Sequence, residues 1–175
     1  MKYITILFLM MSLTGCSQEK LQEYKSEKGG FAFSYNDLWE KQLMNGHTVF
    51  LTKGDKEDKT NFRNNLNVIV QDLSQNPMSL EDYHNLTLQQ MQQALGKNTV
   101  TSDKGVTIGG VNAKELFYTI PKDISKGNFL DLKLKQAYLI KNNKAYLITY
   151  TAKTKDFEKY LQSANTFFET FKLLN

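Results

Sequence analysis

The chain has 175 residues, of which 41% are hydrophobic and 12% aromatic, and its formal net charge is +4. This length and composition indicate one folded domain and exclude a wholly disordered chain. The positive charge comes from lysine, because Arg63 is the only arginine. Arginine is the preferred residue for paired contacts to phosphates and base edges, so we expect no nucleic-acid partner.

The amino terminus has the parts of a bacterial lipoprotein leader. Lys2 supplies a positive start, and the apolar run over residues 3–11 is too short to span a bilayer, which needs about 20 residues. The sequence Leu13-Thr14-Gly15-Cys16 then looks like a lipobox, an aliphatic residue and two small residues before cysteine. We therefore predict a signal peptide over residues 1–15 and lipid on the Cys16 thiol, which would hold the protein on a membrane.

The lipid on Cys16 also predicts where the protein is located. Ser17 resembles an export-permissive residue, which favours the periplasmic face of the outer membrane in a Gram-negative organism. Without an outer membrane, the same leader predicts the outer face of the plasma membrane. Residues 16–29 are polar and charged, so we expect a tether there, followed by a single domain over residues 30–175.

The first half of the domain predicts three strands and one helix. Residues 31–35, 47–52 and 66–70 have strand-like patterns, and the charged loop between the last two contains Asp55, Glu57 and Asp58 without the residue order of a calcium loop. After Pro77, Ser79 is a candidate N-cap with Asp82 three residues later, and apolar residues recur at helical spacing as far as Leu95. We expect Gly96 to end this helix.

The second half predicts more strands and a second helix. Short strands at 99–102 and 106–108 precede a Gly109-Gly110 turn, and a strand follows as far as Ile120. Residues 132–151 form a hairpin around Asn142-Asn143 that pairs Tyr138 with Leu147 and Leu139 with Tyr146, and both of its faces are apolar. A helix over about 155–173, capped by Thr154, carries an apolar stripe that includes Phe167, Phe168 and Phe171. The predicted fold is α+β, an α/β/α sandwich whose central antiparallel sheet is covered by helices on both faces.

The segment from Gly30 to Trp39 resembles the opening pattern of the PsbP-like family, Gly-Phe-x-Phe-x-Tyr-Pro-x-x-Trp. Here it is Gly30-Phe31-Ala32-Phe33-Ser34-Tyr35, with Asn36 at the proline position and Trp39 at the end. The later helix and hairpin are similar as well, so the resemblance covers about residues 29–173. It implies an antiparallel sheet flanked by helices, accessory or binding roles, and no shared catalytic motif.

The candidate chemical groups are few. His47 and His84 lack a second metal ligand at recognised spacing, and we expect surface or boundary positions for both. Zinc at His84, near Glu81 and Asp82, is a weaker hypothesis. We therefore predict no catalytic, metal or cofactor site, and Cys16 as the only functional residue that the sequence identifies.

Two functions are compatible with these features. The first is a lipid-anchored accessory protein of the cell envelope, not an enzyme, that binds another envelope protein. The alternative is a binding protein for a small apolar or lipid ligand, held in a pocket between sheet and helix. The aromatic residues of the last helix and of the two-faced hairpin motivate this second hypothesis.

Overall fold

The computed structural model describes residues 20–54, 60–96, 99–123, 125, 127 and 129–174. The predicted signal peptide, Cys16 and the acidic residues Asp55, Glu57 and Asp58 lie outside these described residues. Within them, no helix has both the length and the apolar character needed to cross a membrane.

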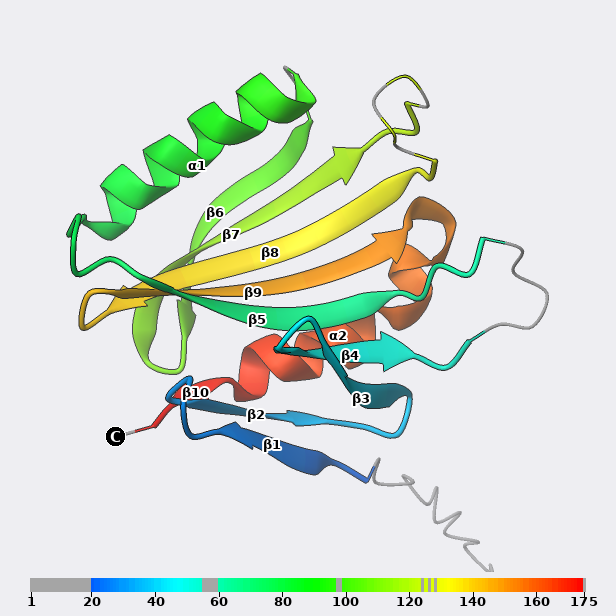
Figure 1. The fold of residues 1–175 in the computed structure, drawn as a ribbon, viewed down its shortest axis with the longest axis horizontal. Helices are drawn as coiled ribbons and strands as arrows, with labels where there is room; N and C mark the ends of the chain where they lie inside the picture. Colours follow the sequence, from blue (N-terminus) through cyan, green and yellow to red (C-terminus); the bar gives the residue numbers. More distant parts are fainter. Residues whose placement is uncertain are drawn as a thin grey trace, which may run out of the picture.

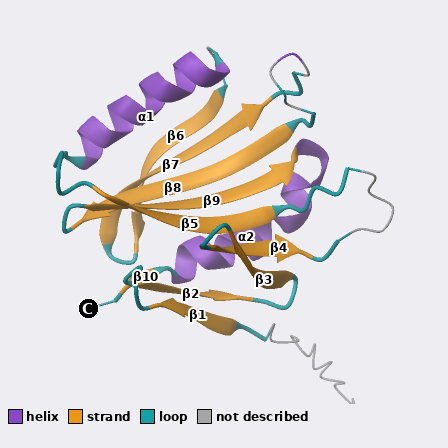
Figure 2. Ribbon diagram, in the orientation of Figure 1, coloured by secondary structure: helices purple, strands orange, loops and turns teal. Residues whose placement is uncertain are grey.

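The described residues form two antiparallel sheets and two α-helices (Figures 1 and 2). The larger sheet has the strand order β3-β4-β5-β9-β8-β7-β6, and the smaller one has the order β1-β2-β10. The elements, in chain order, are β1 (Gln22–Ser26), β2 (Phe31–Tyr35), β3 (Trp39–Met44), β4 (His47–Thr52), β5 (Asn65–Asp72), α1 (Leu80–Leu95), β6 (Val100–Ile108), β7 (Val111–Ile120), β8 (Leu132–Lys141), β9 (Lys144–Lys153), a 3-10 turn (Thr154–Asp156), α2 (Phe157–Thr170) and β10 (Lys172–Leu173). The predicted class, a mostly antiparallel sheet with two helices, is confirmed.

The β8–β9 hairpin has the predicted turn and register. Asn142 and Asn143 have φ angles of 51° and 54°, the left-handed values that a type I′ turn requires. Tyr138 pairs with Leu147, as predicted, and Leu139 pairs with Tyr146. Local turn chemistry therefore determines the register of the two central strands.

The start of α1 also follows the prediction. The Asp82 backbone N–H donates to Ser79 Oγ over 3.1 Å, and the Ser79 backbone N–H donates to Asp82 Oδ2 over 3.4 Å. This reciprocal pair is a capping box, which satisfies two of the backbone donors at the helix start. Gly96 follows the helix with a φ of 91°, in agreement with the predicted C-terminal glycine.

The end of the chain differs from the prediction of one helix from 155 to 173. Thr154 begins a 3-10 turn, α2 runs from Phe157 to Thr170, and Lys172–Leu173 form β10 on the edge of β2. Phe171 is extended, and its ring stacks on Phe31 with the centroids 5.6 Å apart. The helix ends early because the last residues complete the smaller sheet.

The buried apolar residues form two clusters. The large cluster consists of side chains from α2, from β2 and from one face of β4, β5 and β9. The small cluster includes the side chains of α1 that face the sheet. Along β8 the side chains alternate, because Ala137 and Leu139 belong to the large cluster whereas Leu134 and Tyr138 belong to the small one. Both apolar faces of the predicted hairpin are therefore buried.

The motif that carries the family resemblance anchors α2 to the sheets. Trp39 packs edge-on against Phe167, with ring centroids 5.5 Å apart, and its indole N–H donates to Ser163 Oγ over 2.8 Å. Ser163 in turn donates to Oδ1 of the fully buried Asn36 over 2.9 Å. Tyr35, Trp39 and Tyr138 are buried.

The segment predicted as a tether contains a strand. Residues 22–26 form β1 and pair with β2 along its whole length, from Gln22 opposite Tyr35 to Ser26 opposite Phe31. The segment is polar because β1 is an edge strand with one solvent-facing side, and only Tyr24 packs against the large cluster. The smaller sheet therefore begins before residue 30.

Candidate functional site

One part of the large sheet carries exposed apolar side chains. The exposed ones come from β3 and β5, with less exposed residues of β4 between them, on the sheet face that α1 covers further along. Ile69 and Met44 are 48% and 47% exposed, although both are large and apolar. We call this surface the open face. The open face borders a cavity of about 640 Å³. The cavity is lined by residues that include the apolar Met44, Val49, Leu51 and Ile69 and the amides Gln42, Asn65 and Asn67.

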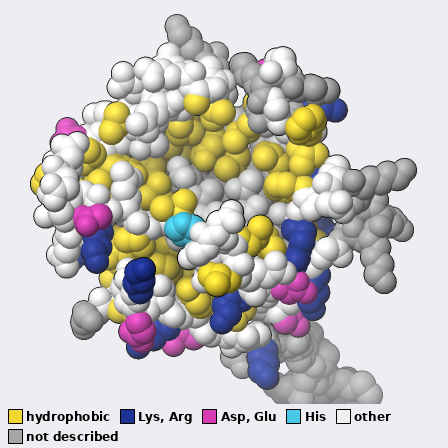
Figure 3. Space-filling model, in the orientation of Figure 1, with side chains coloured by type: hydrophobic (Ala, Val, Ile, Leu, Met, Phe, Trp, Pro, Cys, Tyr) yellow, Lys and Arg dark blue, Asp and Glu magenta, His cyan; other side chains and the backbone are white. Residues whose placement is uncertain are grey.

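The alternation of side chains along β5 produces the open face. Leu66, Val68 and Val70 point into the large cluster, so the intervening Asn67 and Ile69 point to the other side. Ile69 lies opposite Leu147 of β9, which packs against the small cluster under α1. The apolar surface is therefore continuous from the underside of α1 to β5. Figure 3 shows hydrophobic side chains gathered over a hollow between α1 and the β3–β4 hairpin.

Polar groups give the open face fixed hydrogen-bonding positions. Arg63 is held at its edge by an ion pair with Glu40 and by the Thr52 carbonyl oxygen. Asn65 donates to the Arg63 carbonyl oxygen over 3.3 Å. Oδ1 of Asn67 is buried, and it has no hydrogen-bond partner within the described residues. This combination of aliphatic surface and side-chain amides suits a neutral polypeptide better than a charged small molecule.

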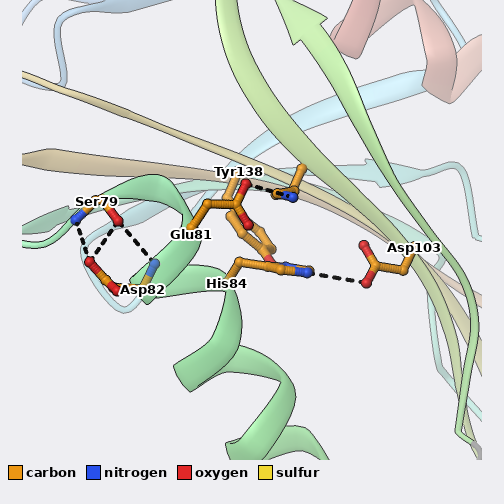
Figure 4. A network of polar contacts seen from close by, with 7 residues as sticks. Ser79, Glu81, Asp82, His84, Asp103 and Tyr138 are labelled. Carbon is orange, nitrogen blue, oxygen red and sulfur yellow. Dashed lines mark hydrogen bonds and ion pairs between the residues drawn. The ribbon is translucent and has the colours of Figure 1, made fainter.

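A second polar group of residues lies where α1 meets the sheet (Figure 4). His84 of α1 is buried, with Nδ1 2.6 Å from the Tyr138 hydroxyl and Nε2 3.1 Å from Oδ2 of Asp103. An ionised carboxylate only accepts, so Nε2 donates to Asp103, and Nδ1 shares a hydrogen bond with the Tyr138 hydroxyl. Nearby, Glu81 forms an ion pair of 2.8 Å with Lys114 of β7.

The geometry of this trio favours a structural role over a catalytic one. Tyr138 has no exposed surface, and burial raises the pKa of its hydroxyl above the ordinary value, so the group stays protonated. A hydroxyl that is buried and protonated cannot reach or attack a substrate in this arrangement. The trio instead connects α1 to β8 and β6.

The structure places the two histidines differently. His47 is exposed at the start of β4, as predicted, whereas the prediction of a surface or boundary position is wrong for His84, which is 5% exposed. Both ring nitrogens of His84 are engaged, Glu81 is paired with Lys114, and Asp82 belongs to the capping box, so zinc at His84 has no support. The described residues contain no cluster of three or more potential metal ligands.

The sequence analysis did not identify the open face. One signal was present, because Val68-Ile69-Val70 is a continuous apolar run on a strand that otherwise alternates. Such a run predicts a strand that is covered on both sides. In the structure, Val68 and Val70 are partly buried, and Ile69 between them is exposed.

The fold places the chain in the class of α+β domains that are built on an antiparallel sheet with two helices. A family model described as PsbP matches residues 19–173. The chain belongs to the PsbP family. No curated protein matches the sequence.

Solved structures share the fold at low sequence identity. Cyanobacterial PsbP (CyanoP) from Synechocystis has a TM-score of 0.59 at 14% identity, over 94% of this chain and 98% of that chain. LpqN of Mycobacterium tuberculosis, described as involved in cell envelope biogenesis, has a TM-score of 0.60 at 15% identity, over 89% and 92%. The Saccharomyces cerevisiae Ran-binding protein Mog1p has a TM-score of 0.53 at 8% identity, over 90% and 97%. These similarities concern the fold alone.

Proposed function

We propose that the protein is a lipid-anchored accessory protein of the cell envelope that binds another envelope protein through the open face. The observation that carries this proposal is the exposure of Ile69 and Met44 over a hollow that the amides of Gln42, Asn65 and Asn67 also line. Contiguous exposed apolar surface on a soluble domain marks interaction sites. The occupant that fits is a neutral polypeptide segment with apolar side chains, because its backbone can exchange hydrogen bonds with Asn65 and Asn67.

The relatives support the two parts of this proposal. LpqN, with the same fold, is described as involved in cell envelope biogenesis, and Mog1p is described as a Ran-binding protein. The lipobox ending at Cys16 supports anchoring by lipid, on the outer membrane or on the outer face of the plasma membrane. In the same proposal the domain is a three-layered scaffold, with the two helices on opposite faces of the sheet, and performs no catalysis.

The alternative, an apolar ligand between sheet and helix, has less support. Under α2 the space is filled by Phe157, Ala164 and Phe167, which have no exposed surface. Under α1, Tyr83 and His84 are buried against the sheet. The cavity of the open face lies over β3, β4 and β5 instead.

Site-specific photo-crosslinking in intact cells tests the open face. A photoreactive residue at position 69 should give a crosslink to one defined protein at near-equal stoichiometry. Leu86 is a matched control, because it is 40% exposed and apolar but lies on the outer side of α1. A second photoreactive variant, at position 44, should crosslink to the same protein. Adding Ile69→Asp to this variant should abolish the crosslink, and adding Leu86→Asp should not. Equal crosslinking from positions 69 and 86, or none from position 69, would refute the assignment of this face.

A further inference from the structure

A second cavity lies at the junction of the two sheets. It has a volume of about 400 Å³, and we call it the seam pocket. Its walls are the side chains of Tyr24, Phe31 and Phe33 from the small sheet and of Phe50, Val68 and Val70 from the large sheet. These walls belong to the side of the sheet that faces the large cluster, whereas the open face lies on the other side of β5.

Two turns form the mouth of the seam pocket, and glycines keep it open. The turn between β1 and β2 contributes Lys28 and Gly29, and the turn between β3 and β4 contributes Gly46. A Cβ atom on Gly29 would lie 2.5 Å from the Phe31 ring and 2.6 Å from Ser26 Oγ, so no side chain fits there. Gly46 has a φ of 79° and no atom within 4 Å of its Cβ position. Gly29 and Gly46 therefore add no side chain at the mouth, where Lys28 and His47 also lie.

Lys28 gives the seam pocket a positive charge, and no acidic residue lines it. Neither Lys28 nor His47, which also lines the pocket, has a hydrogen-bond or ion-pair partner within the described residues. The other charges on β1 are neutralised, because Lys25 pairs with Glu27 at 2.9 Å and Glu23 pairs with Lys172 at 2.7 Å. An unpaired ammonium at the mouth of an aromatic cavity is complementary to an anion with an apolar body.

Hydroxyl groups add donors near the same mouth. Tyr24 donates its hydroxyl hydrogen to Thr48 Oγ1 over 3.0 Å, and the Gly29 backbone N–H donates to Ser26 Oγ over 3.1 Å. Thr48 and Ser26 accept in these two bonds, so each keeps its own hydroxyl hydrogen to donate. Both line the pocket, together with Lys28 and His47.

From these features we propose that the seam pocket binds a small organic carboxylate with an aromatic body. The ring lies against Phe31, Val68 and Val70, beside the packed rings of Tyr24, Phe33 and Phe50, and the carboxylate lies at the mouth beside Lys28. Charge complementarity and the aromatic walls select this class, and the volume suits a ligand of this size. This site differs from the open face, because Lys28 and Phe31 line the seam pocket alone, although His47 and Val68 line both cavities.

Titration of the purified full-length protein with phenylpropionate, followed by amide NMR, tests this proposal. We expect saturable shifts for the backbone amides of Lys28, Gly29 and Gly46. Three probes serve as comparisons: the uncharged phenylpropanol, the cationic phenylpropylamine and the ringless acetate. Each should bind with an affinity at least about tenfold lower than that of phenylpropionate. No saturable shift at the mouth, or equal binding of the alcohol or of acetate, would overturn the proposal.

Two variants test the contribution of charge and of space. Lys28→Gln should weaken phenylpropionate binding about fivefold or more, and Lys25→Gln should not change it. Lys25 is the matched control because it lies on β1, is 53% exposed and does not line the pocket. Val70→Phe, which fills the pocket from β5, should abolish binding while melting curves show a folded protein. Unchanged affinity in Lys28→Gln would refute the carboxylate assignment.

Discussion

His84 connects α1 to two different strands through both nitrogens of its ring. Its partners Tyr138 and Asp103 are far from it in the chain, and nothing in the local sequence indicates that they meet. A histidine three residues after Glu81 on a helix resembles a solvated residue, because i, i+3 neighbours on a helix share a face. The buried position follows from the orientation of α1 on the sheet, which only the tertiary packing determines.

Removal of the His84 hydrogen bonds should destabilise the domain measurably. His84→Phe keeps a ring but leaves the Tyr138 hydroxyl buried without its partner on His84, which costs about 1–3 kcal/mol in the free energy of unfolding. Urea denaturation measures this loss. Adding Tyr138→Phe removes the orphaned hydroxyl, so the double variant should recover part of the stability. Glu81→Gln, which affects an exposed ion pair, should cost less than about 1 kcal/mol. A double variant no more stable than His84→Phe alone would contradict this account.

Glu115 of β7 should make the stability sensitive to acid. It is 6% exposed, and its carboxylate lies 2.9 Å from Lys104 Nζ and 3.1 Å from the buried Lys135 Nζ. Burial raises its pKa, but hydrogen bonds from Lys104 and Lys135 outweigh burial, so the pKa lies below the ordinary 4.5. A carboxyl with a lowered folded-state pKa contributes stability above its unfolded pKa, and this contribution is lost as the pH falls through the folded value.

The test is a comparison of melting temperatures across this pH range. Between pH 6 and about pH 3, the melting temperature of the wild type should fall more steeply than that of Glu115→Gln. At pH 7, Glu115→Gln should cost about 1–3 kcal/mol, because Lys135 then lies buried beside a neutral group. Glu158→Gln is a suitable control, since Glu158 is 70% exposed in its pair with Lys133. Parallel pH profiles for the wild type and Glu115→Gln would exclude this role for Glu115.

At the scale of the elements, the sequence predicted those whose signals are local. The β8–β9 register depends on Asn142-Asn143, and the start of α1 depends on Ser79 and Asp82, so short motifs were sufficient. The strands β1, β3 and β10 were not predicted, because they are polar or very short and form through pairing with distant residues. The open face was missed for a related reason, since the pattern of β5 cannot show which of its two sides is covered.

The turn between β6 and β7 provides a test of how α2 and β10 are positioned. Gly109 and Gly110 have φ angles of 57° and 77°, so alanine is strained at either position by about 1–2 kcal/mol. A Cβ on Gly109 would also lie 2.9 Å from the Phe171 carbonyl oxygen, whereas a Cβ on Gly110 would meet no atom within 4 Å. Gly109→Ala should therefore unfold at a lower urea concentration than Gly110→Ala, the matched control. Equal midpoints would show that the segment after α2 does not lie against this turn.

At the scale of the whole molecule, aromatic contacts join the smaller sheet to the larger one. Phe33 of β2 lies 5.2 Å from Phe50 of β4 and 4.7 Å from Phe167 of α2, measured between ring centroids. Tyr24 of β1 adds a contact of 5.3 Å to Phe50. The first described strand is therefore part of the domain and not a separate arm. The length of chain between Cys16 and the folded domain is accordingly shorter than the predicted tether of residues 16–29.

The last prediction concerns the predicted lipid anchor at Cys16. β1 begins at Gln22, so residues 17–21 span at most about 20 Å between a lipidated Cys16 and the domain. The wild type should partition into the detergent phase of a Triton X-114 extract, and mass spectrometry should find an acylated Cys16 at the mature amino terminus. Cys16→Ala should move the protein to the aqueous phase, because all the predicted acyl chains are on this one residue. Ser17→Ala is the control and should stay in the detergent phase. A Cys16→Ala variant that remains in the detergent phase would exclude Cys16 as the anchor.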